Sequence, residues 1–123
     1  FNLLSNLIIK NNINLIVGSS FGGMLGYWLA EKHKIPALLF NPALHIKKSL
    51  VYFEINHNCS PYKLIVLGKK DKVVDPILST KILKKNLNEK KYEIINCDEL
   101  AHKIDIETFK KQTEYFYNKI KSL

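Results

Sequence analysis

Short apolar runs alternate along the chain with longer segments whose apolar residues recur at helical spacing. Four of the runs predict buried β-strands, each closed by a glycine, asparagine or cysteine. They are "INLIVG" at 13–18, "IPALLFN" at 35–41, "YKLIVLG" at 62–68 and "KYEIINC" at 91–97. Four other segments predict helices: 2–12, 21–33, 77–87 and 106–123. This alternation predicts an α/β fold, with a mostly parallel sheet of about four strands flanked by helices on both faces.

Several local signals place the ends and faces of these helices. Asp75 before Pro76 is a helix start, with the carboxylate as N-cap and proline in the first turn. Asp105 is expected to cap the final helix in the same way. The apolar residues of the two terminal helices roughly follow one face each. These are Leu3, Leu4, Leu7 and Ile8 in the first helix, and Ile106, Phe109, Phe116 and Ile120 in the last.

Residues 41–60 interrupt the alternation with an irregular segment that holds one or two helical turns at most. Its apolar residues follow the second predicted strand, so they could form a small cap or acyl pocket, or equally part of the core. They are Leu44, Ile46, Leu50, Val51, Tyr52 and Phe53.

Length and composition favour one globular domain over residues 1–123. No run reaches the roughly 18 apolar residues that span a bilayer, and no secretory signal is visible, so we expect no membrane association. Cys59 and Cys97 lie far apart without metal-like spacing, which predicts reduced thiols in a cytoplasmic protein. The net charge is +8, but all 19 basic residues are lysines spread along the chain. Without arginine, the residue best suited to forked recognition of phosphate and guanine, we expect no nucleic-acid partner.

The segment "GSSFG" at 18–22 fits the G-x-S-x-G pattern between a predicted strand and a predicted helix. Such a turn forces its central residue, here Ser20, into a strained backbone conformation that exposes the hydroxyl above the sheet. Gly18 and Gly22 are expected to remove Cβ atoms that would collide there. The backbone N–H of Phe21 would then point to where an oxyanion forms, at the positive end of the helix.

Other interpretations of these glycines are weaker. A phosphate-binding loop needs a lysine and a hydroxyl residue after its last glycine, and Met24 and Leu25 follow Gly23 instead. The dinucleotide pattern G-x-G-x-x-G is absent as well. A tight packing corner between strand and helix without chemistry stays open at this point.

A serine nucleophile needs a histidine base and a carboxylate, and on a parallel sheet they follow in the order Ser, Asp, His. Asp71 follows the third predicted strand and His102 follows the fourth. The competing candidates are explained more simply. Asp75 is the expected cap before Pro76, and Asp98 and Glu99 are expected to be solvated loop residues or to support the site from outside. The other histidines lie at the end of a lysine-rich helix or before the third strand: His33, His45 and His57.

The stretch "LIVGSSFGGMLGYWLAEKHKIPALLFNPAL" resembles the nucleophile region of the YqiA-like esterases, a family of the α/β-hydrolase superfamily. "LGKKDKVVD" is similar to the acid-bearing loop of that family, and "AHKIDIETF" to its histidine loop and final helix. The resemblance implies Ser20 as nucleophile, Asp71 as acid and His102 as base. It also implies hydrolysis of short-chain esters or acyl thioesters, as small-molecule substrates, without metal or cofactor.

The same resemblance implies an earlier strand followed by a His-Gly loop that supplies a second oxyanion N–H. No His-Gly occurs in this sequence, in which Phe1 is followed directly by the first predicted helix. We therefore expect an N-terminally incomplete, partial α/β-hydrolase fold. Its exposed edge strand would favour self-association. The alternative function is a catalytically inactive scaffold that binds a partner through this edge or through its lysine-rich face.

Overall fold

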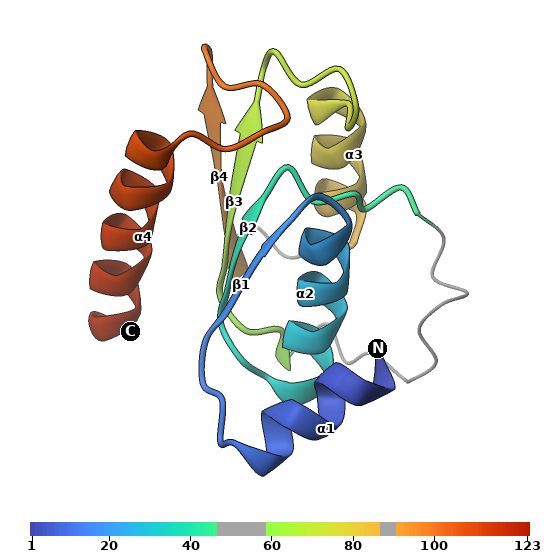
Figure 1. The fold of residues 1–123 in the computed structure, drawn as a ribbon, viewed down its shortest axis with the longest axis vertical. Coiled ribbons are helices and arrows are strands. Elements are labelled where there is room, and N and C mark those ends of the chain that lie inside the picture. Colours follow the sequence, from blue (N-terminus) through green and yellow to red (C-terminus); the bar gives the residue numbers. More distant parts are fainter. Residues whose placement is uncertain (47–58, 87–90) are drawn as a thin grey trace.

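The computed structural model of the chain describes residues 1–46, 59–86 and 91–123, and Figure 1 shows their arrangement. The strands are β1 (Ile16–Ser19), β2 (Ala37–Phe40), β3 (Lys63–Gly68) and β4 (Tyr92–Cys97). The helices are α1 (Asn2–Lys10), α2 (Ser20–His33), α3 (Pro76–Asn86) and α4 (Ile106–Lys121). All strand pairs are parallel, in the spatial order β1-β2-β3-β4. The predicted α/β class with a four-stranded parallel sheet is confirmed.

Among the described elements, α4 covers one face of the sheet and α2 and α3 cover the other (Figure 1). Alternate residues of β2 and β3 face opposite sides, and both strands are fully buried. Leu39 and Ile65 belong to the cluster packed by α2, whereas Leu38 and Leu64 belong to the cluster that includes Phe116 of α4. The side chains after the strands therefore gather at the carboxyl edge of one sheet.

The first strand differs from the prediction of a buried strand. It spans Ile16–Ser19 only, and it alternates between half-buried and exposed residues. Val17 is 50% exposed. The cause is position, because β1 has a partner strand on one side only in the described part of the chain.

The predicted apolar faces of the two terminal helices are only partly right. In α1 the buried residue is Ser5, whose Oγ lies 2.7 Å from His33 Nε2 of α2, while Leu3 is 72% exposed. In α4 Phe116 is buried as expected, but Ile106 is 85% exposed. Ile106 is the first residue of α4, and at this point the helix does not yet pack against the sheet. Asp105 caps α4 as predicted, accepting a hydrogen bond from Thr108 N at 3.0 Å.

The irregular segment after β2 is described only as far as Ile46. Leu44 is buried in the core and Ile46 packs against the same cluster, which settles these two residues as core. Leu50, Val51, Tyr52 and Phe53, the other candidates for a cap or acyl pocket, lie outside the described residues.

A buried ion pair lies at the amino end of the sheet. Lys63, the first residue of β3, has its Nζ 2.6 Å from Oε1 of Glu31 in α2, and both side chains are fully buried. Ser60 Oγ donates to the second carboxylate oxygen at 3.0 Å, and the ammonium lies 5.1 Å from the ring centroid of Tyr27. Burial lowers the pKa of Lys63 despite the carboxylate beside it. The sequence showed nothing that distinguished this lysine from the others.

Removing one partner of this pair is expected to destabilise the fold strongly. Lys63→Met should lower the free energy of unfolding by about 3–5 kcal/mol, because the Glu31 carboxylate stays buried without its counter-charge. The double variant Glu31→Leu, Lys63→Met should recover most of that loss. Lys69→Met is the matched control, since it breaks the exposed pair with Asp98 and should cost about 1 kcal/mol or less. Urea denaturation measures all three, and equal costs for the two single variants would contradict the prediction.

Candidate active site

The corner between β1 and α2 contains the strain that the motif predicts. The strand ends at Ser19 and the helix begins at Ser20, so no residue links them. Ser20 has a φ of 56°, in the left-handed region that non-glycine residues seldom adopt. Such a conformation costs on the order of 1–3 kcal/mol and persists only where the surrounding structure imposes it. Gly18 permits the corner, because a Cβ on it would lie 2.5 Å from the carbonyl oxygen of Gly22.

The expectation for Gly22 is not met in the same way. Beyond the backbone of its own helix, a Cβ on Gly22 would have no atom of the described residues within 4 Å. The close approach instead involves Gly23, where a Cβ would lie 2.9 Å from Cα of Pro42. The second glycine of the "GG" pair therefore allows the loop after β2 to pack against the start of α2.

The amide of Phe21 lies in the first turn of α2, where backbone N–H groups have no partner within the helix. Ser19 occupies the N-cap position but its side chain makes no capping hydrogen bond. These amides therefore retain their capacity to donate at the positive end of a 14-residue helix. This is the position from which the predicted oxyanion donor would act.

Asp71 has the contacts of an orienting carboxylate. Its side chain is fully buried in the loop after β3. Oδ1 accepts hydrogen bonds from the amides of Val73 at 2.8 Å and Val74 at 2.9 Å, and Oδ2 lies 2.9 Å from His102 Nδ1. Asp75, the competing candidate, instead accepts a hydrogen bond from Ile77 N at the start of α3, as expected of a cap.

His102 is the histidine that reaches a predicted acid. Its side chain is 28% exposed, and contact through Nδ1 leaves Nε2 as the nitrogen available to a second group. The other described histidines do not join this site: His33 contacts Ser5 at the opposite end of α2, and His45 is exposed. His57 lies outside the described residues. Asp98 and Glu99 form exposed ion pairs with lysines of the facing loop, in agreement with a solvated role.

The loops that carry Asp71 and His102 are held together by their backbones. Lys69 N donates to Cys97 O and Lys70 N donates to Leu100 O, both at 3.0 Å. Gly68 allows this approach, because a Cβ on it would lie 2.3 Å from the carbonyl oxygen of Leu100. The acid–histidine pair therefore rests on a rigid junction between the ends of β3 and β4.

Ser20 lies at the same edge, without a direct bond to the pair. A hollow of about 500 Å³ is lined by His102 together with Gly18 and Ser19, the two residues before Ser20. Among the described residues, no hydrogen bond joins Ser20 Oγ to His102. The structure thus brings two of the three predicted catalytic residues into contact and places the third on an adjoining corner. Hydrogen bonds of this kind often tighten only when substrate binds.

Sequence reasoning missed one buried polar residue at this edge, Asn41. It follows β2 directly, is 1% exposed, and has a φ of 42°. Its side chain bonds to the backbones of both the acid loop and the histidine loop. The signal in the sequence was an asparagine directly after a wholly apolar strand, at the start of Asn41-Pro42-Ala43 (the N-P-A segment).

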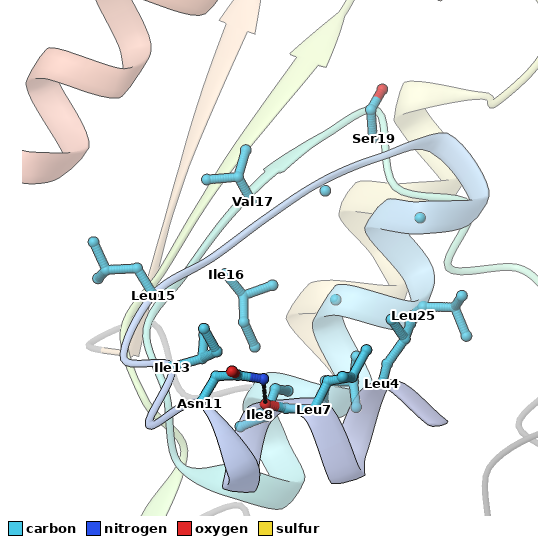
Figure 2. Close-up of a pocket in the computed structure, with 14 residues that line it drawn as sticks. Leu4, Leu7, Ile8, Asn11, Ile13, Leu15, Ile16, Val17, Ser19 and Leu25 are labelled. Carbon is cyan, nitrogen blue, oxygen red and sulfur yellow. Dashed lines mark hydrogen bonds between the residues drawn. The ribbon is translucent and has the colours of Figure 1, made fainter. Parts of the chain in front are cut away.

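A second hollow follows the outer edge of β1. Its volume is about 590 Å³, and Figure 2 shows apolar side chains of α1, β1 and α2 around it. Leu4 and Leu7 of α1 are 38% and 43% exposed there. The groove reaches Gly18, Ser19 and Gly22, so it runs along the sheet edge up to the serine corner.

Comparison with families and solved structures bears on the fold that carries this site. The model of the Uncharacterised protein family UPF0227 matches residues 3–63, the half that holds the serine corner and the N-P-A segment. No curated protein matches the chain. None of the helices in the described ranges is both long and apolar enough to cross a membrane.

Three solved structures illustrate the fold. An α/β serine hydrolase homologue from Coxiella burnetii is 18% identical, with a TM-score of 0.63 over 85% of this chain and 48% of its own. A predicted CIB-like hydrolase from Thermoplasma acidophilum is 17% identical, with a TM-score of 0.68 over 99% of this chain and 58% of its own. A monoacylglycerol lipase from Paleococcus ferrophilus is 15% identical, with a TM-score of 0.67 over 94% of this chain and 72% of its own.

The chain thus spans about half the length of the first two structures. At these identities the likeness shows the fold, and the resemblance to the YqiA-like esterases seen in the sequence accords with the family match. The chain therefore has the fold of the solved α/β hydrolases, and its first 63 residues include the segment that the UPF0227 model matches.

Proposed function

We propose that this chain carries the catalytic residues of a serine hydrolase that cleaves small acyl esters or thioesters. The observation that carries the proposal is the buried Asp71 carboxylate bonded to His102 Nδ1, at the sheet edge where the strained Ser20 corner also lies. A carboxylate, an imidazole and a hydroxyl in this order fit nucleophilic catalysis of acyl transfer. The two free thiols accord with a reducing compartment, and we place the protein in the cytoplasm.

In the proposed first step, His102 Nε2 accepts the proton of the Ser20 hydroxyl as Oγ attacks the acyl carbonyl carbon. Asp71 stabilises the imidazolium through Nδ1–H. The Phe21 amide donates to the oxyanion of the tetrahedral intermediate. Collapse of the intermediate breaks the bond to the leaving alcohol or thiol, which takes its proton from Nε2 and leaves an acyl ester on Ser20.

In the second step, water attacks the acyl-enzyme while His102 accepts its proton. The carboxylic acid leaves as the proton returns to Ser20 Oγ. The hollow beside His102 is lined mainly by apolar side chains, which suit an apolar acyl chain, and Lys103 is the charged residue at its wall. The apolar residues are Val17, Phe40, Ile104 and Phe109.

The test is covalent labelling of the full chain with a fluorophosphonate, followed by peptide mapping. A nucleophile activated by His102 should give one adduct, on Ser20. Failure to label any serine, or labelling on another serine, would reject the proposal. Parallel turnover of a nitrophenyl ester and an acyl thioester then decides which leaving group is preferred.

A second candidate function, association through the edge of β1, has its own supporting observation. Ile16 N donates to Pro36 O on the β2 side, so by strand geometry the amide of Val17 points to the open side. Val17 itself and the flanking α1 leucines are exposed apolar residues. We propose that a second copy of the chain pairs along this edge, which is how unprotected edge strands commonly associate.

Val17→Lys is expected to weaken that association, because a charge on an edge strand opposes pairing with another strand. Sedimentation over a concentration series should show a dimer for the native chain and a monomer for the variant. Val73→Lys is the control, since Val73 is 68% exposed but lies in the loop after β3. A monomer at every concentration of the native chain would refute self-association.

A further inference from the structure

We propose that Asn41 is a positioning residue that sets His102 relative to Ser20, an inference that rests on the proposed function. Asn41 contacts neither reacting atom. It lies between the serine corner and the acid–histidine pair, at the carboxyl end of β2, and bonds to backbone atoms on the histidine side.

All the polar atoms of its side-chain amide have partners. Oδ1 accepts a hydrogen bond from Gly68 N at 2.8 Å. Nδ2 donates to Ala101 O at 2.9 Å and to His102 O at 3.2 Å. The backbone N–H of Asn41 donates to Val66 O at 2.8 Å, which fixes the residue to β3. One buried side chain thus joins the end of β3 to the peptide that carries the histidine.

The residue type fits this position. A carboxylate of the same shape lacks the donor that the two carbonyls of the histidine loop require. An aliphatic side chain would leave those carbonyls and Gly68 N without these partners, at a cost for each buried group. The φ of 42° further favours asparagine, which adopts the left-handed region more readily than most residues.

Pro42 and Ala43, which follow Asn41, contact the serine corner at the start of α2. Ala43 N donates to Ser20 O at 2.9 Å, and Pro42 lies against the position where a Cβ on Gly23 would be. Residues 41–43 therefore contact the backbone of the nucleophile and, through Asn41, the backbone of the base. A shift of this segment changes the separation of Ser20 Oγ and His102 Nε2, to which proton transfer is sensitive.

The decisive variant is Asn41→Gly, which keeps the left-handed backbone accessible and removes the amide. Asn12→Gly is its matched control, because Asn12 also has a positive φ, of 51°, but is exposed and remote in the loop after α1. Two measurements separate positioning from stability. The rate of fluorophosphonate labelling at Ser20 reports the reacting geometry, and the downfield proton resonance of His102 Nδ1–H reports its bond to Asp71. Both are recorded under conditions where denaturant titration shows the variant to be folded.

Asn41→Gly is expected to slow labelling by roughly 100-fold and to weaken or broaden the His102 resonance, while Asn12→Gly changes neither. Asn41→Asp, which keeps the acceptor and loses the donor, should behave like Asn41→Gly and decides the matter if the glycine variant does not fold. Labelling within about threefold of native, with the resonance intact, would overturn the inference. If the native chain is not labelled, the proposed function fails. The resonance then decides alone: its loss in the Asn41 variants supports the positioning role, and its persistence rejects it.

Discussion

A Ser20→Ala chain is expected to lose fluorophosphonate labelling completely and ester turnover by on the order of 10⁶-fold. The reason is that the proposed reaction passes through a covalent bond to Oγ, which no neighbouring group can replace at that corner. Stability should change little, because Ser20 Oγ has no hydrogen-bond partner among the described residues. Labelling intensity on a gel and the hydrolysis rate of a nitrophenyl ester measure the two losses.

The matched control is Ser19→Ala, one residue earlier. Ser19 is exposed, and although it occupies the N-cap position of α2, its side chain makes no capping hydrogen bond. This variant should label at close to the native rate. Turnover that survives in Ser20→Ala, or that is lost equally in Ser19→Ala, would show that the corner has no catalytic hydroxyl at residue 20.

Much of the fold could be predicted because the two central strands, β2 and β3, are short and mostly apolar, while the helices are longer segments with helical spacing. Because β2 and β3 are buried on both faces, they appear in the sequence as continuous apolar runs such as "ALLF". That Ser20, Asp71 and His102 lie at one edge of the sheet could be predicted for a related reason. In such a sheet each loop after a strand arrives at the same edge, so sequence order alone implies proximity.

The remaining features depend on pairwise geometry that periodicity does not encode. Lys63 is charged and starts a strand, yet it is fully buried because Glu31 reaches it from another element. Ile106 is apolar and exposed because α4 has barely started at that point. Asn41 acts through partners 27 and about 60 residues away. Each case requires knowing which distant residue is adjacent.

An Asp71→Asn variant is expected to slow labelling and turnover by on the order of 10⁴-fold while the fold persists. The amide oxygen can still accept the hydrogen bonds from Val73 and Val74 that Oδ1 now receives. The amide nitrogen would then face His102 Nδ1, which must accept a hydrogen bond where it donates one to the Asp71 carboxylate in the proposed mechanism. The imidazole proton moves to Nε2, and the base can no longer accept the proton of Ser20.

Asp75→Asn is the matched control, because asparagine caps a helix about as well as aspartate and Asp75 contacts only the start of α3. Its rates should stay within about twofold of native. The pair of variants distinguishes a catalytic carboxylate from a structural one, since both lie in one short loop and both accept backbone hydrogen bonds. Retention of a tenth or more of the native rate in Asp71→Asn would mean that its bond to His102 is structural, and the acid would have to be sought elsewhere.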